Sequence, residues 1–417
     1  MAMVKEGYKE TDIGIIPEDW DIKFLSEIGS FKKGKGIKKD EVTDTGLQCI
    51  RYGQIYTDYD HAVYVTKSFI NESTALNSVR IKYGDLVLAG SGETLEDIGK
   101  AIVYLGEKEC YVGGDTIIMT PNDLINSLYL SYFLSANVVS NQKRKLGQGN
   151  SIVHLYVDGA KQIKAVIPPS LEQNRIAEIL STTDAHIEKL DKIIEDYQLL
   201  KKGMMKKLLT EGIGHTEFKE TEIGRIPKTW KVMPIFNTGQ YINGKAFKPS
   251  DWESKGVPII RIQNLCNPNA EFNYCNSEIE NKYWVEKGEI LFSWSATLAI
   301  FKWAGEKAYL NQHIYKVIPR DNIEASYLYY QLSFAVARMA ELAHGSTMKH
   351  ITKSNLESFY VAIPTTREEQ MQIASILSAI DARLESLKRI HEEFIQLKKS
   401  LMDKLLTGKI RTTKIKS

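Results

Sequence analysis

The sequence predicts an α+β protein with two similar globular domains, each followed by a long helix, and the two helices paired as an antiparallel coiled coil with pseudo-twofold symmetry. Three observations predict this fold class. The chain repeats itself, because the segment 8–17 returns as 218–227. Each copy ends in a heptad-patterned segment of about 40 residues. Between these segments, short strand-like and helix-like runs alternate without the period of a solenoid.

The repeat extends over nearly the whole chain. Trp20 is matched by Trp230 at an offset of 210 residues, and Asp184 is matched by Asp381 at 197. A small stepwise drift of this kind is what insertions and deletions in loops produce. The period is far longer than that of any solenoid, which indicates a tandem duplication of a domain with its helix.

The duplication predicts four segments: a first globular domain (1–168), a first long helix (169–211), a second globular domain (212–364), and a second long helix with a tail (365–417). Strands are expected at 47–52, 85–89 and 116–119, and helices at 127–134 and 327–339. The copies share glycines, prolines and aromatic residues but differ in polar loops. We therefore expect one scaffold with two different surfaces.

Both long helices begin with a recognisable signal. Ser170 can cap the first helix, and Gln173 three residues later completes a capping box. Thr366 and Glu369 repeat this pattern before the second helix. Gly408 marks the end of that helix, because glycine is favoured just beyond the last turn.

Apolar side chains then recur at alternating spacings of three and four residues, which defines a seam on each helix. The seam includes Ile187, Leu190, Ile194, Tyr197, Leu384, Leu387, Phe394 and Leu401. Lys201 and Lys398 interrupt the two seams at matched positions. A helix about 60 Å long with one apolar stripe needs a partner. We expect the two helices to pair with each other; packing of each on its own domain, or a parallel pairing, are the alternatives.

Composition places the chain among ordinary globular proteins, with 43% hydrophobic and 25% charged residues. No segment approaches the roughly 18 apolar residues of a membrane span, and residues 1–6 open no signal peptide, so a cytoplasmic location is expected. The four cysteines form no CxxC pair, which favours structural thiols over a metal site.

No catalytic motif is present in the sequence. The segment 92–100 resembles a phosphate loop only loosely, and Ala101 stands where such a loop needs Ser or Thr. His154 and His350 occupy matched positions but have no acidic or Cys partner at ligand spacing, so we expect structural roles for both. We therefore predict a chain without catalytic residues, bound metal or cofactor.

Signals for nucleic-acid binding are confined to a few loops, in agreement with a net charge of only +2. The basic, glycine-rich segments 32–39 and 142–151 and their counterparts 243–248 and 344–350 suit phosphate contacts. Arg, Gln and Asn near 51–54 and 261–264 are the side chains that read base edges. The candidates are Lys33, Lys35, Arg51, Gln54, Lys143, Arg144, Ser151, Lys245, Lys248, Arg261, Gln263, Asn264, Thr347 and Lys349.

Two duplicated motifs carry a family resemblance. Ile-Gly-x-Ile-Pro-x-x-Trp stands at 13–20 and 223–230, and Glu-Gln-x-x-Ile-Ala stands at 172–177 and 369–374. In this order they resemble the specificity subunit of type I restriction–modification systems, over almost the whole chain. Each motif alone is weakly specific, whereas their duplicated order is strongly so.

The resemblance implies two target-recognition domains that each read one half of a split double-stranded DNA sequence. It implies that the helices set the spacer and dock two methyltransferase subunits, which restriction and translocation subunits then join. S-adenosylmethionine would bind to the methyltransferase partner, and ATP and Mg to the restriction partner. Because the two surfaces differ, the target should be asymmetric, with half-sites about 10 bp apart.

Three other interpretations stay open at this point. The chain could serve another restriction class, which its neighbouring subunits would reveal. It could be a coiled-coil scaffold with two protein-binding heads, which would not bind DNA with any methyltransferase partner. An enzyme ranks last, because it would need a site that the sequence does not show.

Overall fold

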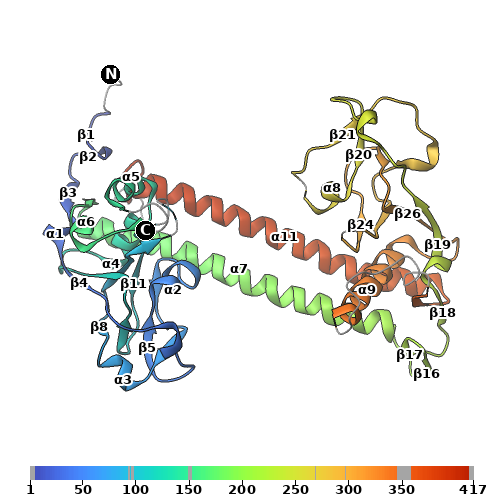
Figure 1. Ribbon diagram of the computed structural model, residues 1–417, viewed down its shortest axis with the longest axis horizontal. Coiled ribbons are helices and arrows are strands. Elements are labelled where there is room, and N and C mark those ends of the chain that lie inside the picture. The colour runs from blue at the N-terminus through green and yellow to red at the C-terminus, as the bar shows by residue number, and fades with distance from the viewer. Residues whose placement is uncertain are drawn as a thin grey trace. The chain divides into compact units, whose positions relative to one another are not determined.

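The computed structural model describes residues 5–92, 94, 98–148, 153–267, 269–295, 297–344 and 358–412, with side chains at 342–344 left aside. The chain forms two compact units: unit 1 comprises 1–191 and 389–417, and unit 2 comprises 192–388. The long helices α7 (Ser170–Thr210) and α11 (Arg367–Leu405) each contribute one half to either unit. Figure 1 shows the elements of both units.

The globular part of unit 1, here the first head, contains a five-stranded sheet in the order β4-β13-β9-β11-β6 and a four-stranded sheet in the order β7-β5-β12-β8. The strands of the first sheet are β4 (Gly29–Lys33), β13 (Thr116–Pro121), β9 (Leu86–Ala89), β11 (Ala101–Tyr104) and β6 (Ala62–Val63). Those of the second are β7 (Ser68–Ile70), β5 (Leu47–Ile50), β12 (Cys110–Val112) and β8 (Val79–Ile81).

The remaining elements of the first head are three two-stranded pairs and several short helices. The pairs are β1 (Tyr8–Thr11) with β2 (Gly14–Pro17), β3 (Asp21–Phe24) with β15 (Lys164–Ile167), and β10 (Ser91–Gly92) with β14 (Val153–His154). The helices are α1 (Leu25–Ile28), η1 (Lys39–Glu41), α2 (Tyr52–Thr57), α3 (Glu72–Ala75), α4 (Ser127–Leu134), α5 (Asn137–Leu146) and α6 (Val157–Lys161).

The globular part of unit 2, the second head, repeats this plan with sheets ordered β19-β26-β23-β24 and β21-β20-β25-β22. The strands are β19 (Gly239–Asn243), β26 (Ile314–Pro319), β23 (Ile290–Ser293), β24 (Ala299–Lys302), β21 (Asn273–Cys275), β20 (Val257–Ile260), β25 (Ala308–Leu310) and β22 (Trp284–Val285). The pairs are β16 (Phe218–Thr221) with β17 (Gly224–Pro227), and β18 (Lys231–Pro234) with β27 (Tyr360–Ile363). The helices are η2 (Ile235–Thr238), η3 (Pro249–Asp251), α8 (Ile262–Cys266), η4 (Asn281–Tyr283) and α9 (Ala325–His344).

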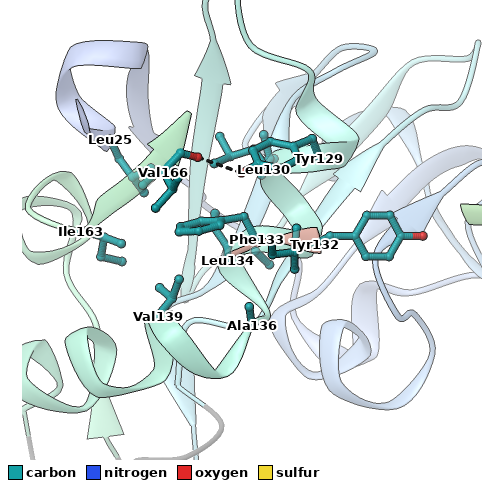
Figure 2. Packing of buried hydrophobic residues seen from close by; sticks show 14 of the residues in the cluster. Leu25, Tyr129, Leu130, Tyr132, Phe133, Leu134, Ala136, Val139, Ile163 and Val166 are labelled. Atoms are coloured by element: carbon teal, nitrogen blue, oxygen red, sulfur yellow. Dashed lines mark hydrogen bonds between the residues drawn. The ribbon is translucent and has the colours of Figure 1, made fainter. Parts of the chain in front are cut away.

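Each head is built around a matched buried core. Trp20 and Trp230 are fully buried in the first and second head. The hydroxyl of Tyr129 in α4 donates a hydrogen bond to the Val166 carbonyl at 2.9 Å, as Figure 2 shows within the packed cluster. In the second head, Tyr327 makes the equivalent bond to the carbonyl of Ala362 at 3.0 Å. The shared tryptophan and tyrosine positions are therefore core positions in both heads.

The long helices run antiparallel within each unit. In unit 1, Asp184 and Asp191 of α7 pair with Lys398 and His391 of α11, so residue numbers rise along one helix as they fall along the other. Unit 2 adds an ion pair between Lys201 and Asp381 with the same direction (Figure 1).

The predicted seam residues are all buried or half-buried on these helices. Their spacing of three and four residues keeps one face of each helix turned towards its neighbour, as in a coiled coil. The helix ends also pack into the heads, because Leu180 and Leu405 lie in the first core and Leu208 and Leu377 in the second. Within each unit, the helices therefore pack both on each other and on the head.

Candidate nucleic-acid interface

The basic loop after β4 is fixed by its backbone. The Gly34 amide donates a hydrogen bond to the Thr116 carbonyl at 3.0 Å. A Cβ atom at Gly34 would lie 2.0 Å from Thr116 Oγ1 and 2.2 Å from the Gly113 carbonyl oxygen, so only glycine fits this approach. Lys33 and Lys35 on either side are exposed. The loop therefore presents two lysines from a rigid backbone, which suits phosphate contacts.

The counterpart loop of the second head has the same construction. The Gly244 amide donates to the Ile314 carbonyl at 3.0 Å, and a Cβ atom at Gly244 would lie 2.0 Å from the Asn311 carbonyl oxygen. Lys245 is half-buried, with its ammonium 5.6 Å from the centre of the Phe247 ring. Lys248 is exposed.

Two of the predicted base readers cap short helices instead. The Oε1 atom of Gln54 accepts a hydrogen bond from the Arg51 amide at 3.1 Å, and its Nε2 atom donates to Ser68 Oγ at 2.7 Å. Asn264 Oδ1 accepts from the Arg261 amide, also at 3.1 Å. Both side chains are buried. Their spacing of three residues from the preceding Arg is that of a helix cap, so we leave Gln54 and Asn264 out of the proposed interface.

The arginines that precede these caps have different surroundings. Arg261 donates to Asn273 Oδ1 at 2.7 Å and lies 5.0 Å above the Trp252 ring, which fixes the guanidinium at a half-buried position. Arg51 Nε is buried and has no hydrogen-bond partner in the described part of the chain. Gln263 is exposed.

Lys143 is a buried side chain rather than a surface cation. Its Nζ atom donates to the carbonyls of Gly99 at 2.6 Å and Leu134 at 2.5 Å, and burial lowers the pKa of this lysine to about 7. It therefore does not suit phosphate binding, because the phosphate could not reach it. The adjacent Arg144 is exposed in the last turn of α5.

Of the other positions singled out in the sequence, only His154 lies within the described residues. Ser151, Thr347, Lys349 and His350 lie outside the described residues. His154 Nδ1 lies 3.0 Å from Ser91 Oγ, which holds the ring between β10 and β14. Within the described ranges, no group of three or more His, Cys, Asp or Glu side chains could hold a metal ion, and no helix is long and apolar enough to cross a membrane.

Sequence inspection missed the residues that join each head to the helix pair. Tyr132 of α4 donates a hydrogen bond of 2.6 Å to Asp184 Oδ2, and Lys398 of α11 lies 2.6 Å from Asp184 Oδ1. In unit 2, Tyr330 and Lys201 contact Asp381 at 2.9 and 2.5 Å. The matched interruptions of the seam by lysine were the available signal. We call each set a junction triad.

A second contact, present at matched positions in both units, holds the first turn of each long helix against a buried tryptophan. Trp20 Nε1 donates to Glu172 Oε2 at 3.0 Å, and Arg411 Nη2 lies 2.9 Å from the same oxygen. In unit 2, Trp230 donates to Glu369 at 3.1 Å, and His215 Nε2 lies 2.7 Å from that carboxylate. The Trp and Glu of the two duplicated motifs thus contact each other in both units.

Comparison with known proteins agrees with this architecture. The family model described as the type I restriction modification DNA specificity domain matches residues 17–196 and 227–394. The MjaX protein of Methanocaldococcus jannaschii, named as a type I restriction enzyme specificity subunit, is 31% identical over 98% of this chain and 97% of its own length. The MjaVIII specificity subunit of the same organism is 28% identical over 99% of both chains.

Solved structures share the fold. The S subunit of a type I restriction–modification system from M. genitalium superposes with a TM-score of 0.58 at 15% identity, over 93% of this chain and 96% of that one. The predicted fold class, two similar α+β domains each followed by a long helix, is confirmed. The two family matches and the end-to-end similarity to the MjaX protein show that this chain belongs to the type I restriction–modification DNA specificity family.

Proposed function

We propose that this chain is the DNA-recognition subunit of a type I restriction–modification complex, and that each head reads one half of a split, asymmetric DNA target. The observation that carries the proposal is the pairing of a repeated backbone with unlike exposed side chains. The first head presents Lys33 where the second presents Asn243 on the same glycine-centred loop, and both side chains are exposed. A shared scaffold fixes how each head docks, while different side chains select different bases.

The phosphate contacts come from the lysines of these loops and from Arg144 in the last turn of α5. Lys33, Lys35, Arg144, Lys245 and Lys248 fix the register of each head on the duplex and carry no sequence information themselves. Arg51, Arg261 and Gln263 lie at the ends of strands of the second sheet in each head and are candidates for contacts nearer the bases.

The long helices serve assembly in this proposal. They set the spacer between the half-sites and dock two methyltransferase subunits, which restriction subunits join. The functional segments are a first recognition domain (1–168), a first helix (169–211), a second recognition domain (212–364) and a second helix with a tail (365–417). The chain performs no catalysis; S-adenosylmethionine, ATP and Mg belong to its partners. The complex works in the cytoplasm, where the DNA is.

Methylation mapping tests the proposal. The chain is co-expressed with the methyltransferase subunit encoded beside it, and methylated adenines in the host DNA are mapped by sequencing. A single split, asymmetric motif is the expected result. A stable complex that leaves the DNA unmethylated would contradict the role, and failure to form any complex would favour a scaffold with two protein-binding heads.

A further inference from the structure

Both heads hold a non-glycine residue in the left-handed region at the same place. Asp115 has φ 54° and His313 has φ 72°, and each stands at the end of the turn that leads into β13 or β26. Side chains rarely adopt this conformation, whereas glycine adopts it freely. In the first head, Gly113 and Gly114 precede the strained residue, so glycine is already used in this turn. Retention of a side chain at the strained position in both copies therefore points to a use for that side chain.

The backbone around this turn is the same in the two heads. The amide of residue 90 donates to the Asp115 carbonyl at 2.8 Å, and the amide of Trp294 donates to the His313 carbonyl at 3.2 Å. The amide of residue 113 donates to the carbonyl of Ile50 at 3.0 Å, and the amide of residue 311 donates to the carbonyl of Ile260 at 3.1 Å. These bonds fix the turn between the basic loop and the ends of the neighbouring strands. β19 and β26, which carry the basic loop and the turn, lie side by side in Figure 1.

The side chains on this common backbone all differ. Positions 90, 113, 114 and 115 of the first head are Gly, Gly, Gly and Asp, and the matched positions of the second head are Trp294, Asn311, Gln312 and His313. Core positions of the two heads, by contrast, stay apolar, as at Trp20 and Trp230. A surface that selects bases should change in this way between two heads that read different half-sites, because base contacts specify whereas backbone and phosphate contacts only position.

From these observations we infer that the turn before β13, with Asp115, and the turn before β26, with His313 and Trp294, are the base-reading elements of the two heads. This inference rests on the function proposed above and names residues for it that sequence inspection did not select. The predicted readers Gln54 and Asn264 are committed to helix caps, which leaves these turns as the polar variable sites beside the lysine loops.

In the second head, the turn offers a histidine with one ring nitrogen, Nδ1, that has no hydrogen-bond partner in the described part of the chain. The His313 ring lies 4.9 Å from that of Trp294, which donates from Nε1 to Asn243 Oδ1 at 3.3 Å. His313 Nδ1 and Asn311 Oδ1 are buried and have no hydrogen-bond partner in the described part of the chain. Since the partner of one ring nitrogen normally sets the state of the other, His313 can donate or accept towards a base. Trp294 supplies an apolar wall for that contact.

In the first head, the turn offers a carboxylate among lysines. Asp115 is exposed and lines one shallow depression together with Lys33, Gly34, Lys35 and residue 114. A carboxylate in a phosphate-binding loop is repelled by the DNA phosphates, which offer it no hydrogen-bond donor, so a hydrogen bond from a base has to offset this repulsion. Asp accepts hydrogen bonds from the amino groups of bases, most often from cytosine N4. We therefore expect the first half-site to present an exocyclic amino group to Asp115.

The experiment compares the methylation motifs of the wild-type complex with those of Asp115→Asn and His313→Asn, since Asn tolerates the left-handed backbone. Each variant should lose its base preference at one position in one half-site only. At that position, the preference for the wild-type base over the other three, measured as methylation of single-base variants of the target, should fall about tenfold. The exposed, matched Asp123→Asn and Asp321→Asn serve as controls and should keep the wild-type motif.

A second measurement covers variants that methylate too weakly to map. Binding of the purified complex is measured on duplexes in which each base pair of both half-sites is varied in turn. A change confined to one position of the matching half-site supports the inference. Unchanged preferences, or an equal loss over both half-sites, would overturn it. If the wild-type complex itself yields no split motif, the proposed function fails first, and this outcome is distinct from a wild-type motif that the variants leave intact.

Discussion

The hydroxyl of Tyr132 donates a hydrogen bond of 2.6 Å to Asp184 Oδ2, and this contact joins α4 of the first head to α7. The other oxygen of the carboxylate faces Lys398 of α11 at 2.6 Å. One aspartate thus joins a head helix and both long helices. The same arrangement recurs at Asp381 in unit 2. Lysines that interrupt an apolar seam are therefore explained by the carboxylates opposite them.

Replacing Asp184 by Asn should destabilise unit 1 by about 1–3 kcal/mol, because Lys398 is largely buried and would lose its carboxylate. The measurement is the free energy of unfolding in urea. Asp196→Asn, at an exposed position of the same helix, is the control and should change it by less than about 0.5 kcal/mol. Equal stabilities of the two variants would mean that the junction triad does not bind the head to the helices.

Replacing Leu384 and Leu387 together by Asp should separate the helices in unit 2 and abolish assembly with methyltransferase subunits, while the heads stay folded. Both leucines are buried in the seam, and a buried unpaired carboxylate cannot be accommodated there. Co-purification and size-exclusion chromatography measure assembly, and circular dichroism reports the remaining β structure. Ala382→Asp, at an exposed position, should assemble normally. Normal assembly of the double variant would refute the helix-pair model.

Arg411→Met should destabilise unit 1 by about 3 kcal/mol, because it leaves the fully buried Glu172 carboxylate without its cation. Thermal unfolding provides the measurement. The control is Lys409→Met, two residues before Arg411, which removes an exposed ion pair with Asp403. It should lower the free energy of unfolding by no more than about 1 kcal/mol. A similar small effect of both changes would show that Arg411 does not hold the start of α7.

Gly34→Ala should lower the free energy of unfolding by about 1–3 kcal/mol, since the added Cβ would overlap backbone as well as side-chain atoms. Gly53→Ala is the matched control: its Cβ would meet nothing within 4 Å, and the residue lies in α2, where alanine is favoured. In urea, the free energy of unfolding should therefore fall for Gly34→Ala and rise for Gly53→Ala. A neutral Gly34→Ala would contradict the rigid loop described above.

Histidine burial predicts a pH dependence of stability. Burial lowers the pKa of His61 to about 3, and the charges of Lys398 and Lys100 act in the same direction. The unfolded chain, with a histidine pKa of about 6.5, binds more protons than the folded chain between these values, so the free energy of unfolding falls as pH falls below 6.5.

The test compares wild type with His61→Phe in urea at pH 6.5 and 5.0. Between pH 6.5 and 5.0, the free energy of unfolding of the wild type should fall by about 1.5 kcal/mol more than that of the variant. His186→Phe, at an exposed position, should lose as much as wild type. If His61→Phe retains the full pH dependence, His61 is not the group whose protonation opposes folding.

The sequence by itself determined the duplication, the seam and the ends of the long helices. These features depend on periodicity and on neighbours within a few residues. Ser170 and Gly408 could be placed near helix ends for this reason, and α7 begins at Ser170 while α11 ends three residues before Gly408. The predicted capping box of Ser170 and Gln173 is wrong, because the Gln173 side chain accepts from the Asn126 amide and donates to the Pro168 carbonyl. The order of two duplicated motifs also sufficed to indicate the family.

The tertiary structure alone decided which polar side chains are available for binding. Gln54 and Lys143 have the residue types that contact DNA, but their partners Ser68 and Gly99 come from other elements, and these contacts bury them. Asp115 showed no signal in the sequence, because its significance lies in a left-handed backbone. Burial and backbone strain arise from contacts between segments distant along the chain, and local sequence patterns do not encode them.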